Sequence, residues 1–230
     1  MSNKVPLITI DGPSSSGKGT ISHLLAHQLG WHLLDSGVLY RVLALAARQH
    51  TIELDNEEAL YLLALELNAQ FVAKEVGSPP RIILENDDIT EDIRSENCGN
   101  AASKVAALPM VRKALLERQR AFFKPPGLVA DGRDMGSVVF PEADLKIFLI
   151  ASFEERCQRR YRQLQQKGIN VSLAGVSQEL KIRDERDKSR AIAPMKPASD
   201  AIIIDTTSLS IEQVVKMILA KLKEYLVCSS

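Results

Sequence analysis

Near its start the chain reads Val5-Pro6-Leu7-Ile8-Thr9-Ile10-Asp11, then Gly12-Pro13-Ser14-Ser15-Ser16-Gly17-Lys18-Gly19-Thr20. The apolar run predicts a buried strand, and the second stretch matches a phosphate-binding loop between a strand and a helix. In such a loop the bracketing glycines let main-chain N–H groups surround an anion, the following helix adds the positive end of its dipole, and the lysine reaches the outer phosphates. The motif predicts a site for a nucleoside triphosphate; a chance Gly/Ser-rich turn is the alternative.

The residue after the lysine departs from the usual pattern. Ser or Thr normally follows directly and contacts magnesium, whereas here Gly19 intervenes and the hydroxyl sits on Thr20. Such an ending resembles the loops of kinases that act on small nucleotides. It weakens the case for direct ligation of Mg²⁺ by Thr20.

Four further apolar runs have the composition of buried parallel strands, and helical patterns alternate with them. They cover residues 31–34, 128–130, 145–151 and 201–204. The sequence therefore predicts an α/β fold with a five-stranded parallel sheet. Ligands of such sheets bind at the carboxyl ends of the strands. The expected functional rim consists of Asp11, Asp35, Asp131, Ala151 and Asp205.

The region between the second and third strands changes period. Residues 70–74 and 81–85 are β-like runs separated by Gly77-Ser78-Pro79-Pro80, and a turn at 86–88 leads to a third run at 89–90. We expect a small antiparallel sheet inserted there. The predicted helices cover 21–29, 38–49, 55–67 with an Asp55/Glu58 capping box, 101–107, 109–123, 153–168 after Ser152, a segment from Val176, and a last helix after Ser210.

The composition is that of a globular protein, with 230 residues, 45% of them hydrophobic and 25% charged. Net charge is zero and aromatic residues make up 5%, so neither a basic field nor stacking platforms favour binding to nucleic acid. Cys98, Cys157 and Cys228 are scattered and lack metal-ligand spacing, which indicates reduced thiols. No segment resembles a signal peptide or a membrane span. We expect a cytoplasmic monomer.

The strand at 128–130 is followed by Asp131-Gly132-Arg133-Asp134-Met135-Gly136. Asp131 is placed to organise Mg²⁺ through water, since that ion gives up its hydration shell reluctantly. Arg133 could hold a phosphate through two hydrogen bonds, and Asp134 is left to accept one. An Asp-Gly turn with a local ion pair is the alternative.

Lys and Arg greatly outnumber acidic residues between positions 156 and 190. If the segment from Val176 is helical, one face carries groups that can grip phosphates and a ribose hydroxyl. These groups are Arg183, Arg186, Asp187 and Arg190. The alternative is a solvated helix with the pairs Glu179–Arg183 and Asp184–Lys188. Gly168 and Gly175 flank a polar stretch that could hinge a mobile lid.

The four histidines have no carboxylate or cysteine partner in the sequence. His23, His27, His32 and His50 are therefore expected to be structural or surface residues.

Taken together, five motifs resemble the bacterial cytidylate kinase family, and the likeness runs nearly end to end. They are the loop Gly12–Thr20, Leu33-Leu-Asp-Ser-Gly-Val-Leu-Tyr-Arg41, Asn100-Ala-Ala-Ser-Lys-Val-Ala106, Asp131-Gly-Arg-Asp-Met-Gly136 and Arg183-Asp-Glu-Arg-Asp-Lys-Ser-Arg190. The resemblance implies transfer of a phosphoryl group from ATP, with Mg²⁺, to CMP or dCMP. It also implies a core domain (1–35, 109–155, 191–230), a nucleoside monophosphate domain (36–108) with its small sheet at about 70–90, and a lid (156–190).

The resemblance also assigns roles to single residues. It places ATP on the loop Gly12–Thr20, with Arg159 or Arg160 beside the adenine, and the metal near Thr20 and Asp131. The catalytic groups would be Lys18, Arg133, Arg183 and Arg190, the last as a lid arginine that approaches the transferred group. The acceptor would be held by Ser36, Arg41, Ser103, Arg112, Arg133, Asp134, Arg183 and Asp187.

The choice of base has a physical argument of its own. Cytosine offers an amino donor that a carboxylate such as Asp134 accepts, and Arg112 can donate to a ring nitrogen or carbonyl. Uracil would present an oxygen to that carboxylate, and a buried mismatch of this kind rejects a substrate strongly.

Two other functions fit the phosphate-binding loop. A kinase acting on a metabolite hydroxyl would call for a general base and fewer arginines at the acceptor site. A nucleotide-dependent switch would hydrolyse slowly, and no Asn-Lys-x-Asp motif supports a GTPase of that kind.

Overall fold

The computed structural model describes residues 5–72 and 80–228 of the chain. Its centre is a parallel sheet of five strands in the order β2-β6-β1-β7-β8. In that order the strands are β2 (His32–Asp35), β6 (Leu128–Gly132), β1 (Leu7–Asp11), β7 (Leu145–Ile150) and β8 (Ile202–Asp205). The predicted α/β fold with a five-stranded parallel sheet is confirmed.

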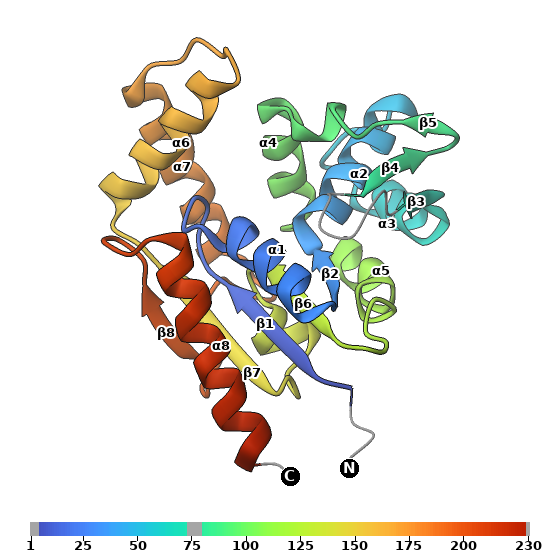
Figure 1. The fold of residues 1–230 in the computed structure, drawn as a ribbon. Helices are drawn as coiled ribbons and strands as arrows, with labels where there is room; N and C mark the ends of the chain where they lie inside the picture. The colour runs from blue at the N-terminus through green and yellow to red at the C-terminus, as the bar shows by residue number, and fades with distance from the viewer. Residues whose placement is uncertain (1–4, 73–79, 229–230) are drawn as a thin grey trace.

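Helices cover both faces of this sheet, because successive side chains of a strand point to opposite sides. Ile8 and Ile10 share a core with α1 (Lys18–Leu29) and α8 (Ile211–Cys228), and Figure 1 shows these two helices side by side in front of the sheet. Leu7 packs on the other face, in a core that includes residues of the π-helical turn η2 (Met135–Val139).

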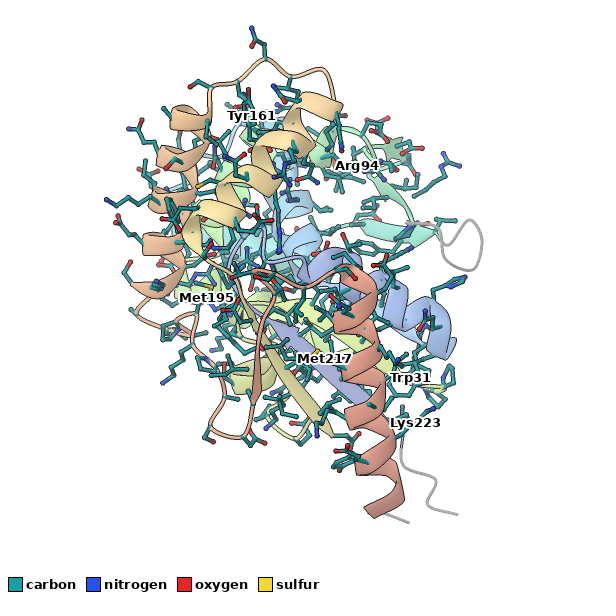
Figure 2. All side chains as sticks on the ribbon, turned by 60° about the vertical axis from the view of Figure 1, so that its left-hand side comes forward. Trp31, Arg94, Tyr161, Met195, Met217 and Lys223 are labelled. Atoms are coloured by element: carbon teal, nitrogen blue, oxygen red, sulfur yellow. The ribbon has the colours of Figure 1, made fainter. Side chains whose placement is uncertain are left out.

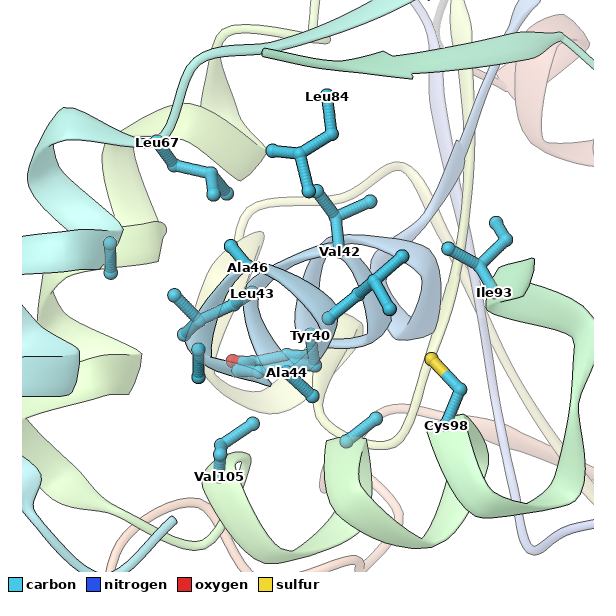
Figure 3. Packing of buried hydrophobic residues seen from close by; sticks show 14 of the residues in the cluster. Tyr40, Val42, Leu43, Ala44, Ala46, Leu67, Leu84, Ile93, Cys98 and Val105 are labelled. Carbon is cyan, nitrogen blue, oxygen red and sulfur yellow. The ribbon is translucent and has the colours of Figure 1, made fainter. Parts of the chain in front are cut away.

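A second core lies beside β2 and contains the chain between β2 and β6. Its helices are α2 (Ser36–Gln49), α3 (Glu57–Glu66), α4 (Glu96–Val105) and α5 (Pro109–Arg120). Apolar residues on every side of α2, from Tyr40 to Ala47, are buried among the others, as the close view in Figure 3 shows for part of the cluster. A helix that is apolar all round must be enclosed by other elements. Because α2 is enclosed in this way, its first turn is held in a fixed position, and that turn faces the cavity of the candidate site.

A small antiparallel sheet joins this second core. It consists of β3 (Ala69–Val72), β4 (Arg81–Leu84) and β5 (Asp87–Asp88), in that order. The predicted inserted sheet is confirmed, although part of the sequence on which it was predicted, residues 73–79 with Gly77-Ser78-Pro79, lies outside the described residues.

A hairpin of two helices, α6 (Phe153–Gln166) and α7 (Leu173–Lys188), projects from the sheet. It has an apolar cluster of its own, made of Cys157, Leu164, Val176 and Leu180. Figure 1 shows the hairpin and the α2–α4 region rising on two sides above the sheet. In the turned view of Figure 2, Tyr161 of α6 and Arg94, which ends the short helix η1 (Asp92–Arg94), lie at the same end of the molecule.

Five helix starts differ from the prediction: α1 begins at Lys18 and α2 at Ser36, each a few residues earlier than predicted, and a capping side chain explains the other three. Asn56, and not Asp55, caps α3 by accepting from the Ala59 N–H at 3.1 Å, so the predicted Asp55/Glu58 capping box is wrong. Ser95 caps α4, which begins at Glu96 and not at 101. Ser172 caps α7 by accepting from the N–H of Gly175 at 3.0 Å, so Gly175 lies in the first turn of a helix and does not flank a loop.

The third strand of the small sheet and the end of α5 also differ. Glu85 and Asn86 adopt positive φ angles of 50° and 79° and form the tight connection themselves. Asp87 therefore pairs with Leu84, and the strand lies at 87–88 and not at 89–90. Helix α5 ends at Arg120 and not at 123.

The described residues include no helix that is long and apolar enough to span a membrane. Cys98 and Cys157 are buried free thiols, which confirms the prediction for these two; the side chain of Cys228 lies outside the description.

Candidate active site

The phosphate-binding loop connects β1 to α1 and has a backbone that only glycine permits at two positions. Gly12 has φ +148°, and a Cβ atom there would lie 2.2 Å from the carbonyl oxygen of Leu149. Gly17 has φ +93°, in the left-handed region that side chains other than hydrogen disfavour. The two bracketing glycines of the motif are therefore required by the path of the chain next to β7.

The carbonyl oxygens of the loop are held from behind by other parts of the chain. Arg156 donates to the Ser14 carbonyl at 3.2 Å, and Arg159 donates to the Ser16 carbonyl at 3.4 Å. Thr206, which follows β8, donates its hydroxyl to the same Ser16 carbonyl at 3.0 Å. Because these acceptors are satisfied by other parts of the chain, the shape of the loop is set before any anion binds.

Two charged groups beside the loop have shifted pKa values. Burial and the neighbouring Arg133 lower the pKa of Lys18 to about 8. Burial raises the pKa of Asp131 to about 7, against the opposing effect of Lys18, and Asp35 adds to the rise. Both shifts show that the two charges are poorly solvated. A phosphate bound next to Lys18 would add negative charge there and favour the protonated lysine.

Asp11 has a structural role, although the sequence placed it on the functional rim. Its carboxylate accepts from the N–H groups of Met135 and Gly136, each at 2.8 Å, and so holds the start of η2 against β1. Burial raises its pKa to about 7, opposed by these two N–H donors. Of the five predicted rim residues, only Asp35 and Asp131 line the cavity described below.

On the side of the second core, a guanidinium and a carboxylate form a buried pair. Arg112 of α5 contacts Asp134, and both side chains are almost fully enclosed. Arg112 also donates to the Ala106 carbonyl at 3.1 Å and lies over the ring of Tyr40, 5.8 Å from its centroid. Burial raises the pKa of Asp134, although Arg112 opposes the rise. The prediction left Asp134 free to accept; the structure gives it Arg112, which leaves further lone pairs of the carboxylate available.

A second cluster joins the end of β6 to the end of α7. Arg133 donates to Asp187 at 2.8 Å and to the Ser14 hydroxyl at 2.9 Å, and Arg190 contacts the other oxygen of Asp187. Burial acts to raise the pKa of Asp187, but Arg133 and Arg190 outweigh it and hold the pKa below its ordinary value. Burial and the nearby Arg133 lower the pKa of Arg183 to about 9. These arginines therefore lie close together with one carboxylate between them, an arrangement that favours a further anion.

The predicted single face of α7 is only partly correct. Arg183 and Asp187 face the cavity, whereas Arg190 lies beyond the last residue of the helix, Lys188, and reaches the cavity from the segment that follows. Arg186 does not line the cavity and instead donates to the Ser103 hydroxyl at 3.1 Å.

The alternative interpretation of α7 as a solvated helix with internal pairs is wrong. Asp184 is buried and pairs with Arg156 of α6 at 2.7 Å, and neither of the predicted pairs within α7 forms among the described residues.

The predicted residues of α2 are anchored to the backbone around them. Ser36 donates its hydroxyl to the Asp131 carbonyl at 2.9 Å. Arg41 donates to the carbonyls of Ile93 and Ser95, at 2.6 and 3.3 Å. A Cβ atom at Gly99 would lie 3.0 Å from the Arg41 guanidinium, so this glycine leaves the space that the arginine fills.

One cavity of about 590 Å³ brings these groups together between the sheet, the second core and the hairpin. Every residue to which the family resemblance gave a role lines it except Gly12, Pro13 and Ser16. None of the four histidines lines it; His32 contacts the Pro125 carbonyl and His50 contacts Glu85.

The cavity also contains residues that sequence reasoning missed. Tyr40 lies beneath Arg112, and Glu96 of α4 contacts Arg160 of α6 across the opening. Tyr40 could have been found from its position beside Arg41 in a quoted motif. Glu96 carries no local signal, because its partner is far away in sequence.

Acidic oxygens suit a magnesium ion at one place in the cavity. Asp131 and Asp35 influence each other and adjoin Lys18, and Thr20 lies exposed at the start of α1. No cluster of three or more His, Cys, Asp or Glu side chains that could cage a metal occurs among the described residues. Mg²⁺ is usually held by one or two carboxylates together with water and substrate phosphates, so the residues present fit this ion.

Comparisons with known proteins agree on one family. The sequence model of the cytidylate kinase family matches residues 8–224. A protein named cytidylate kinase from Pseudomonas fluorescens (strain SBW25) is 63% identical over 222 residues, which cover 96% of this chain and 97% of the relative. Another of that name from Shewanella denitrificans is 60% identical over 223 residues, covering 97% and 98%.

Proposed function

The chain belongs to the cytidylate kinase family, and from this premise we propose which parts of the cavity hold each nucleotide. As a member it is an ATP-dependent nucleoside monophosphate kinase that transfers the γ-phosphoryl group of ATP to CMP or dCMP. We place the phosphates of ATP on the loop Gly12–Thr20, and the monophosphate between the loop and the second core.

The observation that carries this assignment is the division of a single cavity into two kinds of surface. One wall consists of residues of the phosphate-binding loop with Lys18, and the other consists mainly of arginine side chains with the carboxylates of Asp134 and Asp187. Main-chain donors with a helix N-terminus suit a polyphosphate, and guanidinium groups suit a mobile monophosphate that must be turned toward it.

The acceptor is assigned as follows. Arg41, Arg133 and Arg183 hold its phosphate, Asp187 with Arg183 holds its ribose, and Arg112, Asp134, Ser103 and Ser36 surround its base. In the structure Arg133 and Arg190 are both paired with Asp187. An incoming phosphate would replace that carboxylate as the partner of one of them. Arg133 and Arg190 therefore keep an anionic partner both before and after the acceptor binds.

Catalysis needs no general base, because the attacking oxygen belongs to a phosphate that is already anionic at neutral pH. The contribution of the chain is alignment of the two phosphates and neutralisation of charge that spreads in the transition state. Lys18, Arg133, Arg183 and Arg190 are the groups that can do this. A site rich in arginine and without histidine at the cavity wall is what this chemistry requires.

We propose that ATP enters with Mg²⁺, which would be held through water by Asp131 and Thr20. When bound, that ion neutralises charge on the phosphate oxygens. On the ATP side Arg159 supports the loop by donating to the Ser16 carbonyl. Arg160 lies at the opening of the cavity, next to Glu96.

The domain division also belongs to the proposal. The region 36–108 with its own core would bind the acceptor, and 156–190 would act as a lid whose closure excludes water, since an open site would hydrolyse ATP. The small separate cluster between α6 and α7 supports movement of this hairpin as a unit. We further propose a cytoplasmic monomer.

An ADP-release assay with CMP, dCMP, UMP, AMP and no acceptor tests the proposal. Rapid release with CMP and dCMP, slower release with UMP, and little without an acceptor are expected. Acceptor-independent hydrolysis would favour a nucleotide-dependent switch, and no release with any nucleotide would favour a kinase of a metabolite hydroxyl.

A further inference from the structure

The contact between Arg186 and Ser103 connects the hairpin to the base end of the cavity. Arg186 lies on α7, behind the cavity wall, and donates from Nη1 to the hydroxyl oxygen of Ser103 at 3.1 Å. Ser103 lies on α4, is only 4% exposed, and lines the cavity together with Arg112 and Asp134. A residue that does not reach the cavity thus contacts one that does.

The guanidinium of Arg186 has no carboxylate against it. Within residues 5–72 and 80–228 it forms no ion pair, unlike Arg112, Arg133, Arg156 and Arg190. Its charge is therefore directed at the Ser103 oxygen without being neutralised by an acid.

This contact determines which way the Ser103 hydroxyl can hydrogen-bond. A hydroxyl has one proton to donate and two lone pairs, whereas a guanidinium can only donate. Arg186 occupies one lone pair, and its positive charge makes the oxygen a poorer acceptor and the O–H group a better donor. Among the described residues the Ser103 proton has no hydrogen-bond acceptor. The hydroxyl is consequently set to donate into the cavity.

Cytosine and uracil differ in the hydrogen bond that they can form with such a hydroxyl. The ring nitrogen of cytosine at position 3 is an acceptor, whereas in uracil the same atom carries a hydrogen and is a donor. A Ser103 hydroxyl fixed as a donor pairs with the first and opposes the second. A buried polar group that meets the wrong partner costs more than a lost contact, because it stays unpaired.

We propose that Arg186 is a specificity-determining positioning residue, which polarises the Ser103 hydroxyl and so favours a cytosine over a uracil base. The inference rests on the proposed function, because it requires the base to lie next to Ser103. It adds a second discrimination to that of Asp134, at the neighbouring ring nitrogen of the base and from a different element, α4. Because Arg186 belongs to α7, the base is read fully only when the hairpin lies against α4.

The test compares kcat/KM for CMP with kcat/KM for UMP in four variants. Arg186→Met removes the charge and the donor, Arg186→Lys keeps both in part, Ser103→Ala removes the hydroxyl, and the double variant combines the first and third. The matched control is Lys188→Met, an exposed lysine on the same helix. Thermal unfolding of each variant confirms that it is folded.

Arg186→Met is expected to lower the CMP/UMP ratio by about tenfold, the size expected for a charge-assisted hydrogen bond, mostly through a higher KM for CMP. Arg186→Lys should recover part of the ratio, and Lys188→Met should leave it unchanged. In the Ser103→Ala background, Arg186→Met should change the ratio no further, because it acts through that hydroxyl.

Two results would overturn the inference while the proposed function stands. One is a ratio changed by Ser103→Ala but unchanged by Arg186→Met, and the other is additive effects in the double variant. If Ser103→Ala itself leaves the ratio unchanged, Ser103 does not read the base and the inference falls with that assignment. Failure of the unaltered protein to phosphorylate CMP would instead contradict the proposed function.

Discussion

The two walls of the cavity are held in place by different means. The loop wall, Gly12–Thr20, is held by its own backbone and by donors behind it, among them Arg156 and Thr206. The arginine wall, made of Arg112, Arg133, Asp134, Asp187 and Arg190, is held by ion pairs between the same side chains that are proposed to bind the acceptor or, for Arg190, the transferred group.

This difference indicates how each wall responds to its ligand. The loop wall is preorganised, so a phosphate can bind without rearrangement of its donors. The arginine wall must exchange internal partners for the ligand, which makes its geometry depend on whether the acceptor is present. Substitutions in the loop wall should therefore affect every acceptor alike, and those in the arginine wall should depend on the acceptor.

The largest effect is expected for Lys18→Ala, which removes the only ammonium group among the residues that line the cavity. Turnover should fall by about a thousandfold or more with CMP and with UMP alike, because the charge acts on the transferred group. Steady-state ADP release measures it, with Lys104→Ala, an exposed lysine of α4, as the control. A loss of turnover that differs between CMP and UMP would contradict the expectation that the loop wall affects every acceptor alike.

Arg190→Ala should have the next largest effect. It removes a guanidinium that contacts Asp187 and that we propose to act on the transferred group, and turnover should fall by about a hundredfold or more. Asp187 keeps Arg133 as a partner, so the fold should persist. Single-turnover kinetics separate the chemical step from release of product. Turnover close to that of Arg162→Ala, an exposed arginine on α6, would contradict the catalytic assignment.

Asp134→Asn should change the choice of acceptor more than the rate. An amide can donate to the carbonyl that uracil presents where cytosine has an amino group, so the CMP/UMP ratio of kcat/KM should fall by about tenfold or more. The control is the exposed Glu142→Gln. An unaltered ratio would remove Asp134 from recognition of the base.

The smallest effect is expected for Arg156→Lys. Lysine can keep the charge beside Asp184 but cannot also donate to the Ser14 carbonyl in the geometry of a guanidinium. The KM for ATP should rise by about threefold while the KM for CMP stays the same, since the lysine can keep the ion pair with Asp184 of α7 and only the support of the loop wall is lost. Equal changes in both KM values would show that the walls are not independent, and Arg162→Lys is the control.

The sequence predicted the loop wall well because its parts are contiguous. A strand, two bracketing glycines, a lysine and a helix occur within residues 5–29, and each has a local conformational preference. The arginine wall could be predicted as a set of residues from the family resemblance, but its pairings could not. Arg112 meets Asp134 and Arg133 meets Asp187 only after three separate elements have packed.

The errors have the same origin. Asp55 and Asn56 are both good capping residues, and which of them is used depends on where α3 packs. Asp184 has a lysine at the spacing of a helical pair, yet it is buried against α6, where Arg156 is the closer cation. Local preference is a weak guide wherever two neighbouring choices satisfy it equally well.

Thr206 has a consequence for how the protein becomes active during its synthesis. Its hydroxyl reaches back across 190 positions to the Ser16 carbonyl, and its main chain and hydroxyl receive the Arg159 guanidinium. A growing chain on the ribosome therefore contains the whole nucleotide motif long before the support behind it exists. Nascent chains stopped before β8 should carry an intact motif with little affinity for ATP, and the affinity should arise only when the last strand joins the sheet.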